Sequence, residues 1–293
     1  MNYQQFIVAI KEKVALLLGD GMNLQLHTTL KNNGHERIGL TISDEHINIS
    51  PTIYLEEYYN LFTDGFSIEY IVDSILDVYR EVKFDHAWNV HTIKDFSVMQ
   101  SKIAYKVIHA EKNKALLENM PHTSYLDFAV VFYILFEADK SGTATIPITH
   151  ELLSLWNTTI TELQRVAFAN APKLLPVNFS PMQAVINELM GNVFTDEDCN
   201  NDIMFVLTNS LRTFGAACIL YDGILEQIGK HIGENYYLLP SSIHEMIIIP
   251  ESQSPSREHL RKMVMEINET QVEQEDYLSD SIYYYDRKGL HIF

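Results

Sequence analysis

Residues 236–250 constrain the fold of this chain more than any other stretch. Their sequence, YYLLPSSIHEMIIIP, is apolar at both ends and polar only in its middle. This pattern predicts a buried strand broken at Pro240, a short polar elbow, and a second buried strand stopped by Pro250. Polar groups displayed between two core elements can meet a ligand, so the elbow is a candidate ligand pocket. Its side chains are those of Ser241, Ser242, His244 and Glu245.

Length and composition indicate a globular protein. The chain has 293 residues, of which 46% are hydrophobic and 20% charged, enough for one large domain or two packed lobes. The N-terminus has no basic, apolar leader, and no apolar run approaches the roughly 20 residues that a membrane span needs. We therefore expect a soluble cytoplasmic protein that does not bind membranes. The two cysteines, Cys199 and Cys218, lack Cys-x-x-Cys spacing and are expected to be free thiols.

The charge of the chain is strongly negative and unevenly distributed. A formal charge of −18 argues against direct binding to nucleic acid, which needs a basic face. Residues 44–85 carry ten acidic and two basic residues, and residues 251–286 carry nine acidic and three basic ones. These two segments supply most of the negative charge, which favours a protein partner with a basic surface.

Hydrophobic periodicity predicts a mixture of helices and strands. Helices are expected at residues 3–18, 67–83, 100–118, 181–190, 222–232 and 256–268, and two more are expected to be capped by Thr149 and Thr159. Ser180 is expected to cap the helix at 181–190. Strands are expected in a hairpin around Asn32-Asn33-Gly34, at 46–55, 128–136, 143–148, 202–207 and 214–220, in the elbow region, and in a C-terminal hairpin of 281–285 with 290–293. The predicted class is α+β, with a mixed, mostly antiparallel sheet, packed helices and two lobes. A boundary near Pro121 would separate an N-terminal lobe, 1–120, from a C-terminal lobe, 121–293.

The helix predicted at 67–83 has an unusual outer face. Its carboxylates form an acidic ridge at i, i+4, i+8 and i+12, namely Glu69, Asp73, Asp77 and Glu81. Each like-charge pair costs roughly 0.2–0.5 kcal/mol. A solvated face would tolerate that penalty. Alternatively, carboxylates recurring roughly every 6 Å along the helix could imitate the phosphates of nucleic acid and attract a basic DNA-binding protein.

The elbow permits a catalytic and a structural interpretation. Ser241 or Ser242 could act as a nucleophile with His244 as its base, although no Gly-x-Ser-x-Gly elbow is present. Residues 242–245 also have the Ser-x-x-Glu form of a capping box, which favours local hydrogen bonding. In either case a partly buried His244 needs a hydrogen-bond partner to fold stably. Standard metal and phosphate-binding motifs are absent from the sequence, so we expect no metal and no cofactor.

Three islands of sequence resemble an uncharacterised bacterial family, the domain of unknown function 5688, found in anaerobic gut bacteria. They are KNNG (31–34) with NISPTIYL (48–55), LPSSIHE (239–245), and LSDSIYYY (278–285). The islands span most of the chain, which implies that the whole protein is one family member. The resemblance implies no activity, and it suggests a setting in mobile genetic elements.

Two functional hypotheses follow. The first is a non-catalytic binding or interaction protein, in its narrower form a mobile-element accessory factor or a DNA-mimic-like inhibitor. The alternative is a small-molecule hydrolase that uses Ser241 or Ser242 with His244. The sequence does not decide whether the protein is an enzyme.

Overall fold

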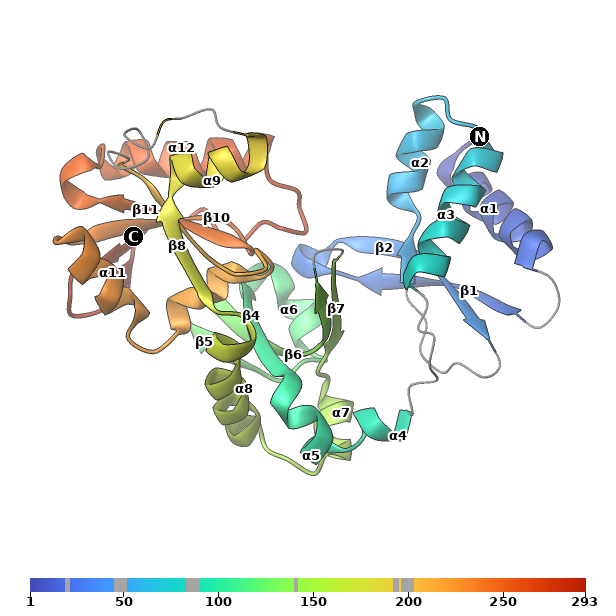
Figure 1. The fold of residues 1–293 in the computed structure, drawn as a ribbon, viewed down its shortest axis with the longest axis horizontal. Helices are drawn as coiled ribbons and strands as arrows, with labels where there is room; N and C mark the ends of the chain where they lie inside the picture. Colours follow the sequence, from blue (N-terminus) through green and yellow to red (C-terminus); the bar gives the residue numbers. More distant parts are fainter. Residues whose placement is uncertain (19–21, 45–51, 83–89, 140–141, 192–194, 196–202) are drawn as a thin grey trace. The chain divides into compact units, whose positions relative to one another are not determined.

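The computed structural model divides the chain into two compact units, Met1–Val98 and Met99–Phe293 (Figure 1). It describes residues 1–18, 22–44, 52–82, 90–139, 142–191, 195 and 203–293. Every strand pairing in this part of the chain is antiparallel, and helices accompany the sheets, so the α+β class is confirmed. The division lies earlier than the boundary predicted near Pro121. Strand β4 (Ile103–His109) pairs along its whole length with β6 (Phe128–Asp139), which ties it to the second unit.

The N-terminal unit is a three-stranded sheet, in the order β1-β2-β3, packed against helices. Its elements are α1 (Tyr3–Leu18), β1 (Met22–Leu30), η1 (Asn32–Gly34), β2 (Glu36–Asp44), β3 (Thr52–Tyr54), α2 (Glu56–Thr63), α3 (Ile68–Val82) and α4 (Val90–Ile93). The predicted first helix, the hairpin around Asn32-Asn33-Gly34 and the helix at 67–83 are all confirmed. Of the segment predicted to be extended at 46–55, residues 46–51 lie outside the described residues.

The core of this unit forms where one face of the sheet meets α1 and α3. Leu40 on β2, Ile10 on α1 and Ile75 on α3 are fully buried. Helical spacing of the apolar side chains in α3 places them on the core side, so Glu69, Asp73 and Asp77 face solvent. The side chain of Ser67 caps this helix by accepting a hydrogen bond from the Tyr70 N–H (3.2 Å).

The second unit contains two further sheets. Its elements are α5 (Phe96–Met99), which begins at the end of the first unit, η2 (Gln100–Lys102), β4, η3 (Glu111–Asn113), α6 (Lys114–Leu117), β5 (His122–Tyr125), β6, β7 (Gly142–Pro147), α7 (His150–Leu155), α8 (Ile160–Leu174), β8 (Val177–Pro181), α9 (Met182–Met190), β9 (Phe205–Asn209), η4 (Gly215–Leu220), α11 (Ile224–Ile232), β10 (Tyr236–Ser242), β11 (Glu245–Pro250), η5 (Glu251–Gln253), α12 (Arg257–Thr270), β12 (Tyr283–Tyr285) and β13 (Leu290–Ile292). One sheet has the order β4-β6-β5, with β7 also paired to β6. The other has the order β13-β12-β10-β11-β9-β8.

The helix predicted at 100–118 is wrong over most of its length, because β4 occupies its centre. Both faces of β4 are covered. Tyr105 stacks on Phe168 of α8 (ring centroids 4.4 Å apart), while Ile108 packs with Leu117 on the opposite side. A strand buried on both faces is apolar throughout and lacks the alternation that distinguishes it from a buried helix.

Two smaller predictions were also wrong. The segment 214–220, expected to be a strand, forms the 3-10 helix η4 instead. Ser180 was expected to cap the helix that follows it, but it lies in β8 and its hydroxyl donates to the Asn178 side chain (2.7 Å). Thr149 and Thr159 do cap α7 and α8 as predicted, by accepting from the N–H groups of Leu152 and Glu162.

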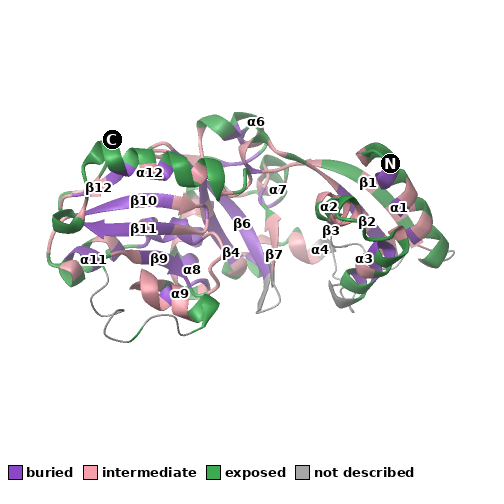
Figure 2. Cartoon of the chain, turned by 90° about the horizontal axis from the view of Figure 1, so that it is seen from above, coloured by how far each residue is buried: buried purple, intermediate pink, exposed green. Residues whose placement is uncertain are grey.

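The central pair of the larger sheet is the predicted double strand, β10 and β11 (Figure 2). The break expected at Pro240 is a β-bulge between Pro240 and Ser242. Successive side chains of β10 point to opposite faces, and each face meets a different helix. Tyr237 packs in one cluster with Leu260 of α12. The hydroxyl of Tyr236 donates to the Leu225 carbonyl of α11 (2.9 Å).

The thiol of Cys218 is expected to be inert in the folded protein. Cys218 is fully buried and its thiol donates to the Thr208 carbonyl (3.3 Å). Burial raises the pKa of this thiol to about 12, so the reactive thiolate is scarce at pH 8. In a Cys199→Ser background, iodoacetamide should label the protein at pH 8 only after denaturant unfolds it. Rapid labelling of the native protein would contradict this assignment. The substitution is needed because Cys199 lies outside the described residues.

Candidate functional site

The polar elbow is the tip of the β10–β11 hairpin. Ser242 pairs with Glu245, and Ile243 and His244 form the turn between them. The Ser242 hydroxyl accepts a hydrogen bond from the His244 N–H (3.0 Å). Local hydrogen bonding by Ser242 is therefore present as predicted. The capping-box form was misleading, because no helix begins here.

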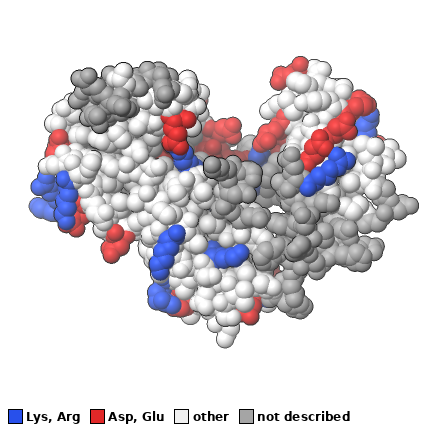
Figure 3. Space-filling model, viewed as in Figure 1, with Lys and Arg blue, Asp and Glu red and all other residues white. Residues whose placement is uncertain are grey.

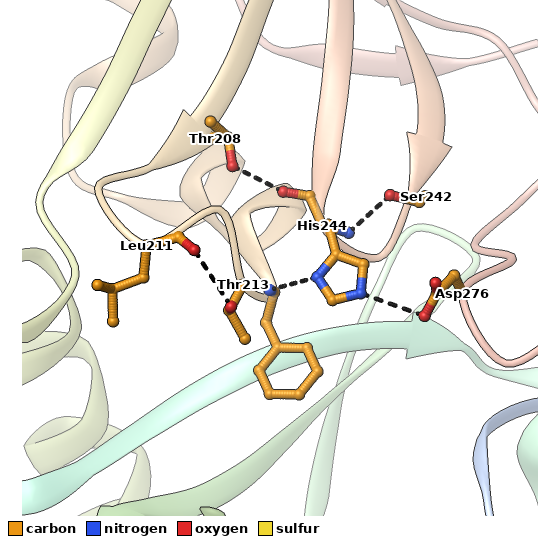
Figure 4. A network of polar contacts seen from close by, with 7 residues as sticks. Thr208, Leu211, Thr213, Ser242, His244 and Asp276 are labelled. Carbon is orange, nitrogen blue, oxygen red and sulfur yellow. Dashed lines mark hydrogen bonds and ion pairs between the residues drawn. The ribbon is translucent and has the colours of Figure 1, made fainter. Parts of the chain in front are cut away.

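Both nitrogens of the His244 imidazole bind other parts of the second unit (Figure 4). Nδ1 lies 3.1 Å from the backbone nitrogen of Phe214, and Nε2 lies 3.1 Å from Oδ1 of Asp276. The His244 carbonyl also accepts from the Thr208 hydroxyl (2.8 Å). His244 thereby joins the hairpin tip to the loop after β9 and to the segment before β12.

These contacts define the tautomer and limit the chemistry. A backbone N–H can only donate, so Nδ1 is the acceptor, and Nε2 carries the proton that it donates to Asp276. A neutral imidazole has a single acceptor nitrogen, and Phe214 occupies it. No nitrogen of His244 is then available to take a proton from Ser241 or Ser242. The hydrogen bonds give the hydrolase hypothesis no support.

The loop that donates to His244 has an unusual backbone. Arg212 and Phe214 both have positive φ values, 52° and 56°, in the left-handed region that bulky residues rarely adopt. The buried side chain of Asn209 supports this conformation by accepting from the N–H groups of Leu211 and Thr213 and donating to the Thr213 carbonyl. The strained conformation directs the Phe214 N–H towards His244.

Close packing beneath the hairpin requires a glycine at position 215. A Cβ there would lie 2.5 Å from the His244 carbonyl oxygen and 2.2 Å from the Thr208 hydroxyl. The ring of Phe214 stacks on the imidazole (ring centroids 5.6 Å apart, 14° between planes), and Lys106 Nζ lies 4.2 Å from the same ring centroid. These contacts hold the turn in place from several directions.

Only two of the four elbow residues take part in this network. Ser242 and His244 share a hydrogen bond. The side chains of Ser241, the extra residue at the bulge, and Glu245 make no hydrogen bond to another described residue. Thr208, Phe214 and Asp276 complete the network, and the sequence offered no signal for them.

A second polar centre holds the LSDSIYYY island. Asp127, in the turn between β5 and β6, accepts hydrogen bonds from the hydroxyls of Ser279 (2.7 Å), Ser281 (3.2 Å) and Tyr283 (2.6 Å). Burial and the nearby carboxylate both raise the pKa of Tyr283, so its hydroxyl remains a donor. The three hydroxyls occur at every second residue, so an extended chain presents them on one side. The alternation of hydroxyl side chains at residues 279, 281 and 283 is therefore the feature of the sequence that indicates a shared hydrogen-bond partner.

The acidic ridge lies on α3, in the other unit. Glu69, Asp73 and Asp77 are exposed, and the side chain of Glu81 is outside the described part. Lys13 of α1 forms an ion pair with Glu69, which holds the pKa of that carboxyl below its ordinary value. Arg80 pairs with Asp77 (2.7 Å). The ridge is therefore not an uninterrupted row of negative charge.

Comparison with known proteins identifies the family. Residues 3–287 match the model of DUF5688, a family of unknown function. The chain belongs to this family. The match confirms the resemblance seen in the three islands. No curated protein and no solved structure matches the chain. Membership of DUF5688 therefore assigns no activity to the chain.

Two further features of this DUF5688 protein concern membranes and metal ions. Among its described helices, none combines the length and apolar character that crossing a membrane requires. Within the described residues, no group of three or more histidine, cysteine or acidic side chains is arranged to hold a metal ion.

Replacing His244 should destabilise the second unit. His244→Ala leaves the Phe214 N–H and the Asp276 carboxylate without their partner, and should cost about 1–3 kcal/mol of unfolding free energy. His244→Asn should cost less, because an amide oxygen can still accept from Phe214. Urea denaturation measures both effects. The exposed His259, replaced by alanine, is the control. Equal stability of His244→Ala and the wild type would refute this structural role.

Removing the Asp127 carboxylate should have a larger effect. Asp127→Ala deprives three hydroxyls of their acceptor. A hydrogen bond to a charged group contributes about 1.5–3 kcal/mol, but bonds that share one acceptor are not additive, so we expect a total loss of about 2–4 kcal/mol. Thermal unfolding of Asp127→Ala can be compared with that of Asp222→Ala, which removes an exposed carboxylate. The prediction fails if the two variants unfold at the same temperature.

Proposed function

We propose that this protein is a non-catalytic interaction protein that binds a basic partner protein through α3. The observation that carries the proposal is the exposed side of this helix and of the residues just before it, which carries the aromatic side chains of Phe66 and Tyr70 and the carboxylates of Glu69, Asp73 and Asp77. Figure 3 shows acidic side chains over α3 with basic side chains beside them. Interfaces combine such aromatic anchors with charged rims.

The ion pairs of the ridge affect the narrower hypotheses. Lys13 and Arg80 partly neutralise Glu69 and Asp77, so the spacing of net charge departs from that of a phosphate strand. Imitation of DNA therefore receives less support than simple attraction of a basic protein. Exposed ion pairs contribute roughly 0–1 kcal/mol, so an incoming cation can exchange with Lys13 or Arg80. A role as a mobile-element accessory factor would use the same contact.

The absence of an available base at the elbow supports the non-catalytic half of the proposal. His244 would have to break its bond with Phe214 or Asp276 before it could act on Ser241 or Ser242. A screen for esterase and phosphatase activity, with Ser241→Ala and Ser242→Ala as controls, tests whether the elbow catalyses hydrolysis. Turnover that either substitution abolishes would overturn the non-catalytic assignment.

The binding half can be measured with a fluorescent oligolysine peptide. Reversing two charges, Asp73→Lys with Asp77→Lys, should lower its affinity about tenfold at low salt, and binding should weaken as salt screens the charges. The matched control reverses Glu266 and Glu269, which are exposed on α12 in the other acidic segment. It changes the net charge by the same amount.

Circular dichroism should be unchanged in both variants, because all four side chains are exposed. An equal loss of affinity in the two variants would show that only the overall charge matters. That result would remove α3 as the binding surface.

A further inference from the structure

An exposed aromatic pair stands at the start of α3. Phe66 and Tyr70 are 45% and 53% exposed, yet their rings stack on each other with centroids 5.1 Å apart and 28° between planes. The backbone holds both rings in position. The Phe66 N–H donates to the Leu61 carbonyl (3.1 Å), and the Tyr70 N–H donates to Ser67. A preformed aromatic platform in contact with solvent loses little conformational entropy on binding.

A carboxylate without an ion-pair partner among the described residues lies one helical turn away. Asp73 follows Tyr70 at i+3, a spacing that makes two helical side chains neighbours. Its exposed carboxylate forms no ion pair with a described residue, whereas Glu69 pairs with Lys13 and Asp77 with Arg80. Tyr70 and Asp73 therefore offer an aromatic face and an exposed carboxylate side by side.

The same unit contains this combination with its cation already in place. The guanidinium of Arg37 lies 4.9 Å from the ring centroid of Tyr54, and its Nη2 donates to Glu57 at 2.7 Å. Tyr54 ends β3 and Glu57 lies in the first turn of α2. Arg37 shows that an aromatic ring and a carboxylate on the surface of this unit can together hold one arginine side chain.

Other aromatic side chains of the chain are covered by cations in the same way. Lys112 Nζ lies 3.3 Å from the ring centroid of Tyr277, and the Arg257 guanidinium lies 3.9 Å from that of Phe293. Among the described residues, no cation covers Phe66 or Tyr70. The platform on α3 is accordingly open to a cation from another molecule.

We infer that Tyr70 and Asp73 form a clasp for an arginine side chain of the partner, so that the partner presents an arginine-rich segment. This inference rests on the proposed function, which requires a basic partner. A planar guanidinium can stack on the aromatic platform while its N–H fork donates to the Asp73 carboxylate. A lysine ammonium is a compact charge that cannot make both contacts with the same geometry.

Affinity for oligoarginine and oligolysine peptides of equal length tests the clasp at one fixed salt concentration. The wild type should bind oligoarginine about two- to fivefold more tightly, the factor that corresponds to a cation–π contact at an exposed site. Tyr70→Leu keeps an apolar side chain but removes the ring. It should bring the ratio of the two affinities close to one, mainly by weakening oligoarginine binding.

Two carboxylate variants provide a matched comparison. Asp73→Asn should weaken oligoarginine more than oligolysine and so reduce the ratio. Asp77→Asn removes a carboxylate that already pairs with Arg80, so it should weaken both peptides alike and keep the ratio. Both side chains are exposed, and circular dichroism can verify that the variants remain folded.

The outcomes separate the clasp from the proposed function. If the wild type binds both peptides equally, or if Tyr70→Leu keeps the preference for arginine, the clasp is refuted while binding of a basic partner stands. If neither peptide binds, the proposed function and the clasp fall together. A preference for arginine that depends on both Tyr70 and Asp73, but not on Asp77, establishes the clasp.

Discussion

The His244 imidazole, held between the Phe214 N–H and the Asp276 carboxylate, is the contact on which the architecture of the second unit depends. It fixes the tip of the β10–β11 hairpin, and that hairpin is the centre of the larger sheet. The loop that meets it adopts a left-handed conformation at Phe214 and allows only glycine at the next position. Strain of this kind persists only where surrounding contacts over-determine the backbone, as Asn209 and Thr208 do here. The elbow thus joins the hairpin tip to the loop after β9 and to the segment before β12.

The two polar centres of the second unit share a design. At each centre, one side chain on a turn forms hydrogen bonds with segments that are distant in sequence. His244 binds the loop after β9 and Asp276, and Asp127 binds the hydroxyls of the LSDSIYYY island. Two of the three islands of DUF5688 therefore contribute directly to holding this unit together. Partly buried polar groups are costly when unpaired, so a motif of this type specifies a fold and need not specify a reaction.

The N-terminal unit differs in where its polar groups point. The apolar side chains of α3 are buried in the core. The opposite side of the helix carries carboxylates that repel one another and aromatic rings that remain exposed. Lys13 and Arg80 relieve part of that repulsion, and Asp73 remains between them without an ion pair among the described residues. A helix arranged only for stability would place lysines at alternate positions of the ridge. Under the proposed function, a basic partner protein supplies the missing positive charge.

Local patterns in the sequence determined much of this protein. The 3.6-residue period of α3, the Asn-Asn-Gly turn, the threonine caps of α7 and α8, and the double strand 236–250 all depend on neighbouring residues, and all were predicted. Tertiary structure alone decided what depends on distant residues. Strand β4 lacks an alternating pattern because α8 and α6 cover its two faces, and η4 begins at Gly215, where the hairpin tip packs closely. The partners of the His244 imidazole and of the Asp127 carboxylate lie 30 to 156 residues away. No periodicity within a segment encodes such contacts, since they arise only when separate elements pack together and must satisfy each other's hydrogen bonds.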